Sequence, residues 1–534
     1  MGGTMSSETI VFARRASGLV RELNWWDVLL ITIAGPAASG MTYYSVKVPG
    51  VYPGGNMVLA FFLGGLVWLL PALLFAVLAS SFPRSGSLYV AISRSTHPIL
   101  GFLPMWLYVI SCGLTVGFLN YIGLYVIGSA LQVAGHIADN TSLVNAGDWI
   151  DSNYTRLWVS ALMTVGVWLV ELGGLARLKW FIRSLIYVPL VLTIITLSLF
   201  FFVDGKAAWD GVYGSGVAAK IGELARDKGI SGALLSPGKA LGDSLLWVFW
   251  AYASLEVVSF VGSEVKSPRT SYLRGMGIGF AAVMALYCVN AWGPGLCFGS
   301  DFVRDYGWLY YNHPDALKNL LGVTPPAPSI PFYAGVCARS AWFAVLLGIG
   351  YFMWYLNTSV VLWLASVRGL FAMAFDRQLP LGLCSVSSSG SPTTATHVTG
   401  ALALLGCLVG LGDAAGTGSA AVVMALLDYA GLFFIWTVGL AALFLPVTRP
   451  DLFETSTFQY RWGSVPVLSV VGGAVLGIGF YMILYVGLEM TRTYSLLLTA
   501  AMVTVGLALA AWMYSRNRRE GIDPNLIFAQ IPPA

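Results

Sequence analysis

Residues 33–42 read IAGPAASGMT, and they interrupt an apolar run that begins near Trp25. Small residues, a proline and two glycines stand where a membrane helix would otherwise be continuous. Backbone cannot stay unpaired against lipid, so a broken helix survives only where protein covers it or where it lines a polar cavity. The stretch therefore predicts a broken helix and, at the break, a binding site.

A second interruption lies in the later half of the chain. Residues 250–256 read WAYASLE, within a long apolar span that carries a carboxylate near its middle. Paired interruptions at matching places in two halves of a chain are typical of transporter binding sites. We therefore predict that helix 1 is unwound near residues 35–40 and helix 6 near residues 251–256.

The composition excludes an ordinary globular protein. Of 534 residues, 57% are hydrophobic and 10% are charged, and the mean hydropathy is +0.76. Soluble domains carry about 25% charged residues. The chain is therefore expected to be an all-α polytopic membrane protein embedded in the lipid bilayer. Its net charge of +4 is small and indicates no nucleic-acid partner.

Apolar stretches of about 20 residues, the length that crosses a hydrocarbon core, predict twelve transmembrane spans. Of the 29 Lys and Arg residues, 18 lie on the side of the N-terminus and four lie in the short connections opposite. The positive-inside rule then places both termini in the cytoplasm of a multi-pass protein of the cell (plasma) membrane. The predicted spans are residues 25–46, 56–82, 98–132, 155–172, 180–203, 243–263, 275–299, 339–370, 398–412, 420–446, 465–487 and 494–515.

Ten of these spans divide into two blocks of five. Five is an odd number, so the second block must be inverted relative to the first, and each block opens with its broken helix. We expect an inverted repeat, with two further spans after it. The predicted organisation is a cytoplasmic N-terminus (1–24), repeat 1 (25–203), an outer loop (204–242), repeat 2 (243–446, with the outer loop 300–338), the last two spans (447–515) and a cytoplasmic C-terminus (516–534). Both outer loops are long enough to carry short surface helices.

Three motifs lie at the ends of the second, sixth and eighth predicted spans. Residues 256–269 read EVVSFVGSEVKSPR, residues 82–89 read FPRSGSLY, and residues 368–380 read RGLFAMAFDRQLP with GSP after them. Together with the first break, they resemble the signatures of the amino acid, polyamine and organocation transporter superfamily, permease type. The resemblance implies the LeuT-type five-plus-five inverted-repeat fold with helices 1 and 6 unwound. It also implies secondary transport of amino acids or small amines. Ser254 stands where that family usually has glycine.

The first break supplies the first half of a substrate-binding site. Amides freed at Ala38, Ser39 and Gly40, followed by Met41, would begin the outer half-helix. Unpaired donors at the positive end of a helix dipole favour a carboxylate. Alternatively, the small residues form a packing kink that lets neighbouring helices approach.

The second break supplies the complementary half. Carbonyls released around Trp250, Ala251 and Ala253, next to Ser254, can accept hydrogen bonds from an ammonium group. The rings of Trp250 and Tyr252 can attract the same cation. The alternative is that these rings only pack within the span.

Two acidic residues, Glu256 and Asp428, lie away from the ends of predicted spans, where a charge is costly and usually faces the bundle interior. Burial without a cation favours the neutral acid, which makes Glu256 the candidate proton-coupling residue. Glu256 has a structural alternative, as a protonated carboxyl bonded to a neighbouring helix. Asp428 is a candidate gate of the outer vestibule or a partner for a cationic side chain, or else a residue at a wetted helix end.

Asn357, Thr358 and Ser359 form a candidate cation site in the eighth span. Hydroxyl oxygens combined with freed carbonyls suit a hard cation such as Na⁺. Ser and Thr in helices also commonly bond back to their own backbone. We expect H⁺ as the coupling ion, with Na⁺ as the competitor.

These observations predict a secondary active transporter of zwitterionic amino acids with apolar or aromatic side chains, working by alternating access as a symporter or antiporter. The alternative substrate is a cationic amino acid or a polyamine. A channel or a membrane sensor is the alternative from another class, because broken helices also line pores. An enzyme is not expected: HExxH and GxSxG are absent, the four histidines are isolated, and nothing indicates a cofactor or a resident metal.

Overall fold

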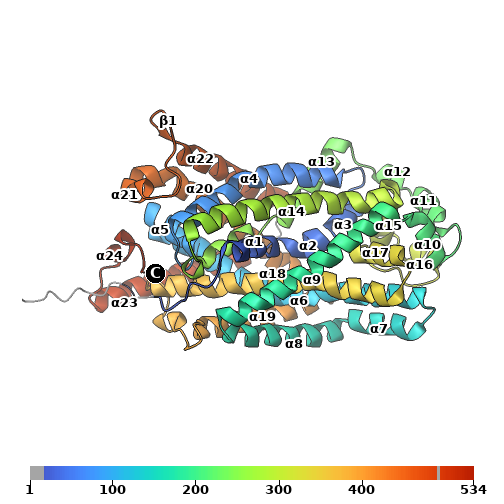
Figure 1. Ribbon diagram of the computed structural model, residues 1–534, viewed down its shortest axis with the longest axis horizontal. Helices are drawn as coiled ribbons and strands as arrows, with labels where there is room; N and C mark the ends of the chain where they lie inside the picture. Colours follow the sequence, from blue (N-terminus) through green and yellow to red (C-terminus); the bar gives the residue numbers. More distant parts are fainter. Residues whose placement is uncertain (1–11, 13–16, 490–492, 534) are drawn as a thin grey trace, which may run out of the picture.

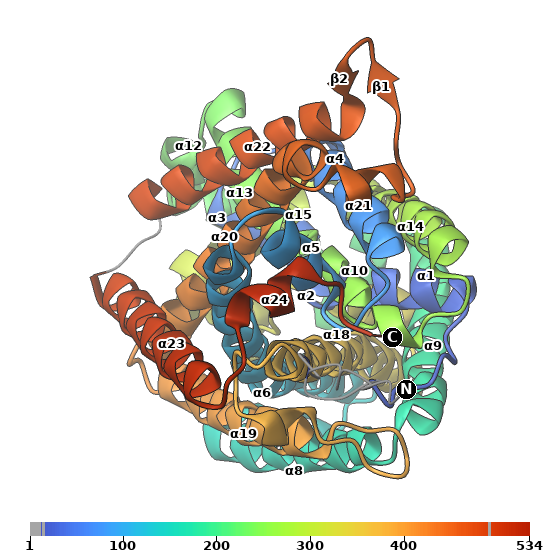
Figure 2. The same cartoon turned by 90° about the vertical axis from the view of Figure 1, so that its left-hand side faces the viewer.

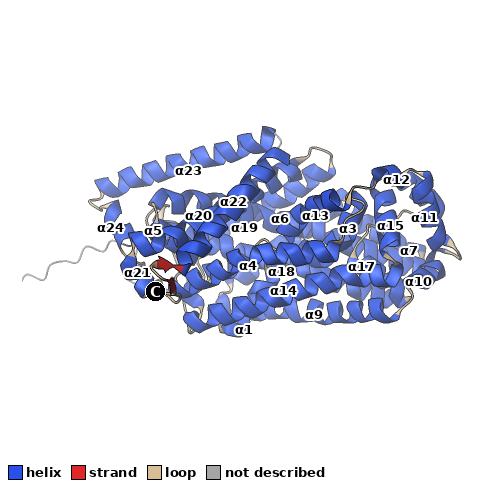
Figure 3. Cartoon of the chain, turned by 90° about the horizontal axis from the view of Figure 1, so that it is seen from above, coloured by secondary structure: helices blue, strands red, loops and turns tan. Residues whose placement is uncertain are grey.

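The structure is a computed structural model that describes residues 12, 17–489 and 493–533. Long helices run along one axis of the molecule (Figure 1), and most of the described chain is helical (Figure 3). Strands β1 (Arg461–Trp462) and β2 (Val465–Pro466) form a small antiparallel hairpin. The chain is thus an all-α protein in its architecture, as its composition predicts.

Eleven helices in the described part of the chain are long and apolar enough to cross a membrane. They coincide in order with the second to twelfth predicted spans, which confirms a polytopic membrane protein. The total of twelve crossings stays a prediction. The helices are α4 (Met57–Ser81), α6 (Pro98–Ile137), α8 (Asn153–Leu172), α9 (Leu175–Phe202), α13 (Pro237–Ala251) with the 3-10 helix η1 (Leu255–Phe260), α14 (Pro268–Phe298), α18 (Ala341–Phe375), α19 (Thr393–Ala414), α20 (Ser419–Thr448), α22 (Val467–Glu489) and α23 (Thr493–Arg519).

The first predicted span consists of three short helices. They are α1 (Trp25–Ala34), α2 (Ala37–Thr42) and α3 (Tyr44–Val51). The break is narrower than the predicted 35–40, because only Gly35 and Pro36 separate α1 from α2. Proline has no N–H to continue α1, but its fixed φ suits the start of the next helix. The two alanines that follow Pro36 then favour helix again.

The sixth predicted span is interrupted as well. Helix α13 ends at Ala251, and residues 252–254 form a turn before η1 begins at Leu255. The predicted unwound segment, 251–256, therefore overlaps the turn and extends one residue before it and two beyond it. Both interruptions lie within the helical bundle, so their free backbone groups need partners from neighbouring helices.

The two ends of the bundle differ. One end, the outer end, carries the short helices α7 (Thr141–Asp151), α10 (Gly205–Tyr213), α11 (Val217–Asp227), α12 (Ile230–Ala233), α15 (Ser300–Asn312), α16 (Pro314–Leu321) and α17 (Ile330–Ala338). The opposite, inner end carries α5 (Ser87–Ser95), η2 (Gly262–Glu264), η3 (Leu381–Cys384), α21 (Pro450–Glu454) and α24 (Pro524–Ala529). Figure 2 shows both described ends of the chain at the inner end, as an even number of crossings requires.

Helix α18 is the central element of the bundle. Its most apolar stretch is wholly buried, whereas α23 lies at the periphery (Figure 2). Helix α18 packs against α6, α9, α19, α2 and η1. This position places the middle of α18 beside both interruptions and decides which side chains reach them.

Helices α6 and α19 approach each other through two glycines. A Cβ atom on Gly117 would overlap the carbonyl oxygen of Ala403, and one on Gly406 would overlap the carbonyl oxygen of Leu114. Contacts of small residues allow membrane helices to pack closely in this way.

We therefore expect Gly117→Ala and Gly406→Ala each to destabilise the protein by about 1–3 kcal/mol, the usual cost of overpacking. The measurement is the melting temperature of the purified protein in detergent. Gly277→Ala on α14 is the matched control, because a Cβ atom there meets nothing within 4 Å. An unchanged melting temperature in both α6 and α19 variants would show that this packing is wrong.

Candidate functional site

The two helix interruptions lie directly against each other. A Cβ atom on Gly35, in the first break, would overlap the carbonyl oxygen of Ser254, in the second. Ser254 has a left-handed backbone conformation, with φ of +74°. Residues other than glycine rarely adopt that conformation, which gives a physical reason for glycine at the corresponding place in related sequences. The close approach brings the free backbone groups of both breaks into one region.

Tyr287 of α14 joins the two breaks. Its hydroxyl oxygen lies 2.5 Å from the carbonyl oxygen of Pro36 and 2.7 Å from that of Ala251. A tyrosine hydroxyl has one hydrogen, so it donates to one of these carbonyls at a time. A Cβ atom on Gly40 would also overlap the Tyr287 ring, so glycine is needed there for the close approach. Sequence reasoning did not identify Tyr287.

Thr358 of α18 bridges the first break. Its hydroxyl donates to the carbonyl of Ala34 at 2.9 Å and accepts from the amide of Ala38 at 3.1 Å. One side chain thus provides a hydrogen-bond partner for a carbonyl in the last turn of α1 and for an amide in the first turn of α2. Asn290 of α14 adds a bond from its side-chain nitrogen to the carbonyl of Met41, at 3.0 Å.

The residues predicted around the first break all lie in α2. The Ala38 amide is occupied by Thr358. Ser39 is the third residue of α2, so its amide has no partner within the helix, whereas the Gly40 amide is the first that can pair with the N-cap carbonyl of Pro36. The Met41 side chain is fully buried, and Ser39 is half-buried. Their role in binding a carboxylate stays a prediction.

The residues predicted around the second break differ in their contacts. The Ala251 carbonyl is bonded to Tyr287, and the Trp250 carbonyl accepts from the amide of Ala253 at 3.1 Å. Tyr252 is fully buried, and its hydroxyl donates to the carbonyl of Phe61 on α4 at 2.9 Å. The Tyr252 hydroxyl is thus engaged with α4, and the role of the Tyr252 ring in binding a cation stays a prediction. The Trp250 ring is half-buried, with an edge against Phe249.

Glu256 lies in η1 and is 4% exposed. One of its carboxyl oxygens is 2.5 Å from the hydroxyl of Tyr108 on α6, and the other has no hydrogen-bond partner among the described residues. The Tyr108 ring stacks on Phe260 and Phe434. No cationic side chain of the described residues pairs with this carboxyl within 4.0 Å.

The remaining predicted residues do not converge on one point. Ser359 bonds to α6, through Asn120 at 2.8 Å, and also back to the Tyr355 carbonyl of its own helix. Neither polar atom of the buried Asn357 amide has a partner among the described residues. Thr358 and Ser359 thus face different helices. Asp428 on α20 is also buried, and one of its carboxyl oxygens has no partner among the described residues.

Buried ion pairs hold the inner end together. Arg94 of α5 pairs with Asp376 just after α18, and the Tyr89 hydroxyl donates to the same carboxylate at 2.8 Å. Burial by itself lowers the pKa of Arg94, but Asp376 outweighs burial and raises that pKa above its ordinary value. Arg368 of α18 pairs with Glu264 of η2 at 2.7 Å. These contacts join helices that surround the breaks.

Aromatic and backbone contacts hold the outer end together. The Lys47 ammonium of α3 lies over the rings of Tyr43, Trp247 and Tyr311, at 5.3, 4.8 and 5.6 Å from their centroids. A Cβ atom on Gly50 would lie 2.5 Å from the backbone of Gly307, so α3 and α15 are in close contact. Contacts therefore join the elements around the breaks at both ends of the bundle.

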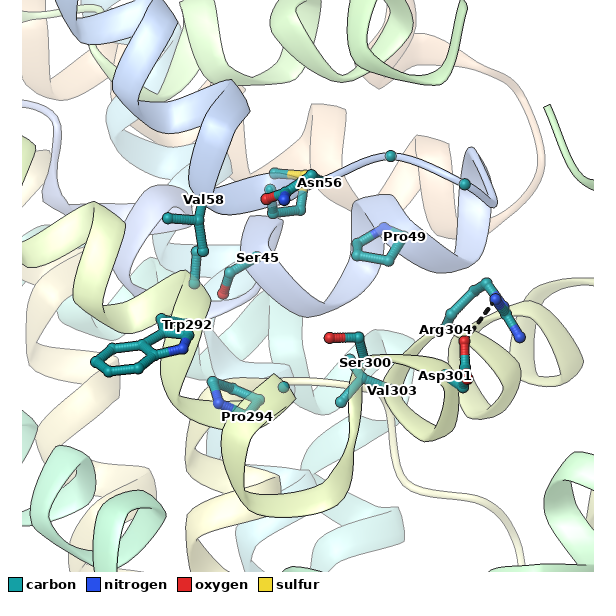
Figure 4. Close-up of a pocket in the computed structure, with 15 residues that line it drawn as sticks. Ser45, Pro49, Asn56, Val58, Trp292, Pro294, Ser300, Asp301, Val303 and Arg304 are labelled. Atoms are coloured by element: carbon teal, nitrogen blue, oxygen red, sulfur yellow. Dashed lines mark ion pairs between the residues drawn. The ribbon is translucent and has the colours of Figure 1, made fainter. Parts of the chain in front are cut away.

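A cavity of about 490 Å³ lies beside α3 at the outer end (Figure 4). Ser45, Trp292 and Pro294 line it, and Arg304 forms an ion pair with Asp301 at its rim, at 2.8 Å. A second cavity, of about 700 Å³, lies at the inner end between α5, α23 and α24. Neither cavity is lined by the residues of the two breaks.

A multi-pass helical bundle with two adjacent broken helices is typical of membrane carriers with discontinuous helices. The chain belongs to the amino acid permease family, whose sequence profile matches residues 23–507. This confirms the resemblance seen in the motifs, and it indicates a transporter rather than an enzyme.

Several curated relatives are named as transporters. The methylthioribose transporter of Bacillus subtilis is 23% identical over 483 residues, which cover 88% of this chain and 89% of that protein. The branched-chain amino acid permease of Bacillus subtilis is 22% identical and covers 81% of this chain and 83% of its own. An uncharacterized transporter of Mycobacterium tuberculosis is 24% identical over 69% of each chain.

Replacing Thr358 by valine tests the bridge across the first break. The variant leaves a buried N–H and a buried C=O unpaired, so we expect a loss of about 1–3 kcal/mol in stability. Thr358→Ser, which keeps the hydroxyl, should restore most of it. The measurement is the melting temperature of the two purified variants. Equal values would mean that the Thr358 hydroxyl does not satisfy the Ala34 carbonyl and the Ala38 amide.

Proposed function

We propose that this protein is a secondary active transporter of amino acids that works by alternating access. Membership of the amino acid permease family and the names of its relatives support transport. The observation that carries the proposal is the direct contact between the two broken helices at Gly35 and Ser254, covered at both ends by further contacts. Such a region is reached from one side only when the contacts on that side open.

The proposed fold is the LeuT-type five-plus-five inverted repeat, with residues 25–203 as repeat 1 and residues 243–446 as repeat 2. The interrupted helices, α1 with α2 and α13 with η1, each begin one of these blocks. The proposed orientation places the inner end in the cytoplasm of the cell, because most Lys and Arg residues of short connections lie there.

The proposed substrate is a zwitterionic amino acid with an apolar or aromatic side chain. Its carboxylate would meet the amides at the start of α2, Ser39 and Gly40 together with Ala38. Its ammonium would meet the carbonyls of Pro36 and Ala251, which Tyr287 holds in this structure. The branched-chain amino acid permease among the relatives supports a substrate of this kind.

The relatives also support an alternative. A methylthioribose transporter covers more of this chain than the branched-chain amino acid permease does, and its named substrate has neither a carboxylate nor an ammonium group. Cationic amino acids and polyamines remain the other alternative, since Glu256 and Asp428 are both buried without a cationic partner among the described residues.

A competition experiment separates these substrates. In proteoliposomes, we expect unlabelled leucine and phenylalanine to compete with radiolabelled leucine in counterflow, while putrescine and methylthioribose compete weakly. Weak competition follows from the missing carboxylate, which leaves the α2 amides unsatisfied. Equal competition by putrescine would refute the carboxylate assignment. Conduction of leucine without counterflow would indicate a channel.

We propose that protons drive or gate transport through Glu256. The carboxyl group is buried, it accepts a hydrogen bond from the neutral hydroxyl of Tyr108, and no cation of the described residues pairs with it within 4.0 Å. A charge there is costly, so protonation accompanies the closed state. Sodium is the competitor, with Thr358 and Ser359 as ligands, but in this structure the Thr358 hydroxyl is engaged at the first break and Ser359 faces α6.

The Glu256→Gln variant tests the coupling ion. The glutamine keeps the shape of the side chain and cannot titrate, so leucine uptake should lose its dependence on pH while leucine–leucine exchange persists. Replacing sodium by choline should change little in wild type. Uptake that collapses without sodium, or an unchanged pH profile in the variant, would reverse the assignment to Glu256.

A further inference from the structure

Three charged side chains are buried together at the inner end of the bundle. Glu171 is the penultimate residue of α8, Arg368 belongs to α18 and Glu264 to η2, and each residue is at most 2% exposed. Arg368 uses Nε and Nη2 to hold both carboxyl oxygens of Glu264, at 3.2 and 2.7 Å. Both carboxyl oxygens of Glu264 thus accept a hydrogen bond from the same guanidinium group.

The third member of the cluster has no such partner. One carboxyl oxygen of Glu171 and the Nη1 of Arg368 are both buried without a hydrogen-bond partner among the described residues. The fields of Arg368 and Glu264 act on Glu171, and they have opposite signs. An ionised Glu171 would add a second negative charge to a buried site that holds one positive charge. Such a charge is costly to bury, so the neutral acid is favoured.

The other helices around Glu171 carry further titratable side chains, but among the described residues none of them forms an ion pair with Glu171 within 4.0 Å. Arg177 of α9 lies against Gly173, in the turn that follows α8, and the His397 ring of α19 packs edge-on against Trp168, one turn earlier. Helix α6 also packs on α8. Residues 98–137 of α6 contain no Asp, Glu, Lys or Arg and one histidine, His136, which lies at the outer end, far from Glu171. Arg368 is therefore the cation for which Glu171 and Glu264 compete.

We infer that Glu171 is a second proton-binding site, and that Arg368 controls it by pairing with either Glu264 or Glu171. With Arg368 held by Glu264, the carboxyl of Glu171 keeps its proton. When α18 and η2 separate at the inner end, Arg368 loses Glu264 and pairs through Nη1 with Glu171. Glu171 then releases its proton to water at the inner end. This coupling to transport rests on the proposed function, but the protonation of Glu171 does not.

Infrared spectroscopy of the purified protein at neutral pH tests the protonation directly. A carboxylic acid has a C=O stretching band that a carboxylate lacks. We expect Glu171→Gln to lose one such band relative to wild type. Glu264→Gln should lose the same band although Glu171 is still present, because Arg368 is then free to pair with it.

Glu22→Gln is the matched control, since Glu22 lies near the surface beside Lys179 and should leave the bands unchanged. A melting curve for each variant checks that it is folded. If Glu171→Gln retains every carboxylic acid band, Glu171 is ionised and the inference is wrong. If the band persists in Glu264→Gln, the two carboxylates do not compete for Arg368, which also overturns it.

A transport experiment tests the coupling separately. In proteoliposomes that contain a pH-sensitive dye, external leucine should move protons in wild type, and Glu171→Gln should lose this movement while leucine–leucine exchange continues. Proton movement that persists in Glu171→Gln would disprove the coupling role. Wild type that does not exchange leucine would refute the proposed substrate and leave the infrared result standing.

Discussion

The structure depends on satisfying the backbone groups that two broken helices release inside a membrane protein. Lipid offers no hydrogen bonds, so each free carbonyl and amide must find a partner within the bundle. Thr358 bridges Ala34 and Ala38 across the first break, and Tyr287 reaches carbonyls of both breaks. Both side chains come from helices that are themselves continuous, α18 and α14. Two unbroken helices therefore hold the interrupted ones in place through neutral hydroxyl groups.

The buried charged residues differ between the middle of the bundle and its inner end. Within the bundle, the buried acids Glu256 and Asp428 have no cationic partner among the described residues. At the inner end, Arg94 and Arg368 pair with carboxylates that are also buried. Breaking a buried ion pair is costly because it strands an uncompensated charge. Opening the inner end is therefore expensive unless a second partner, such as Glu171 for Arg368, replaces the one that is lost.

Much of the fold follows from local sequence patterns. The length of apolar runs predicted the spans, and Gly35 with Pro36 predicted the first break, because each feature depends on neighbouring residues alone. The partners of the breaks depend on tertiary packing. Successive residues of a helix are turned by about 100°, so Thr358 meets the first break while Ser359 meets α6. A run of three polar residues cannot reveal this difference without the positions of the surrounding helices.

Tyr287 also limits what a ligand must provide at the breaks. Its single hydrogen serves the Pro36 and Ala251 carbonyls one at a time. A primary ammonium group has three N–H donors and could satisfy both carbonyls together. In the proposed mechanism, an amine that displaces the hydroxyl therefore gains two hydrogen bonds where the protein alone makes one. A neutral sugar gains less from the same exchange, because hydrogen bonds from a charged donor are roughly twice as strong.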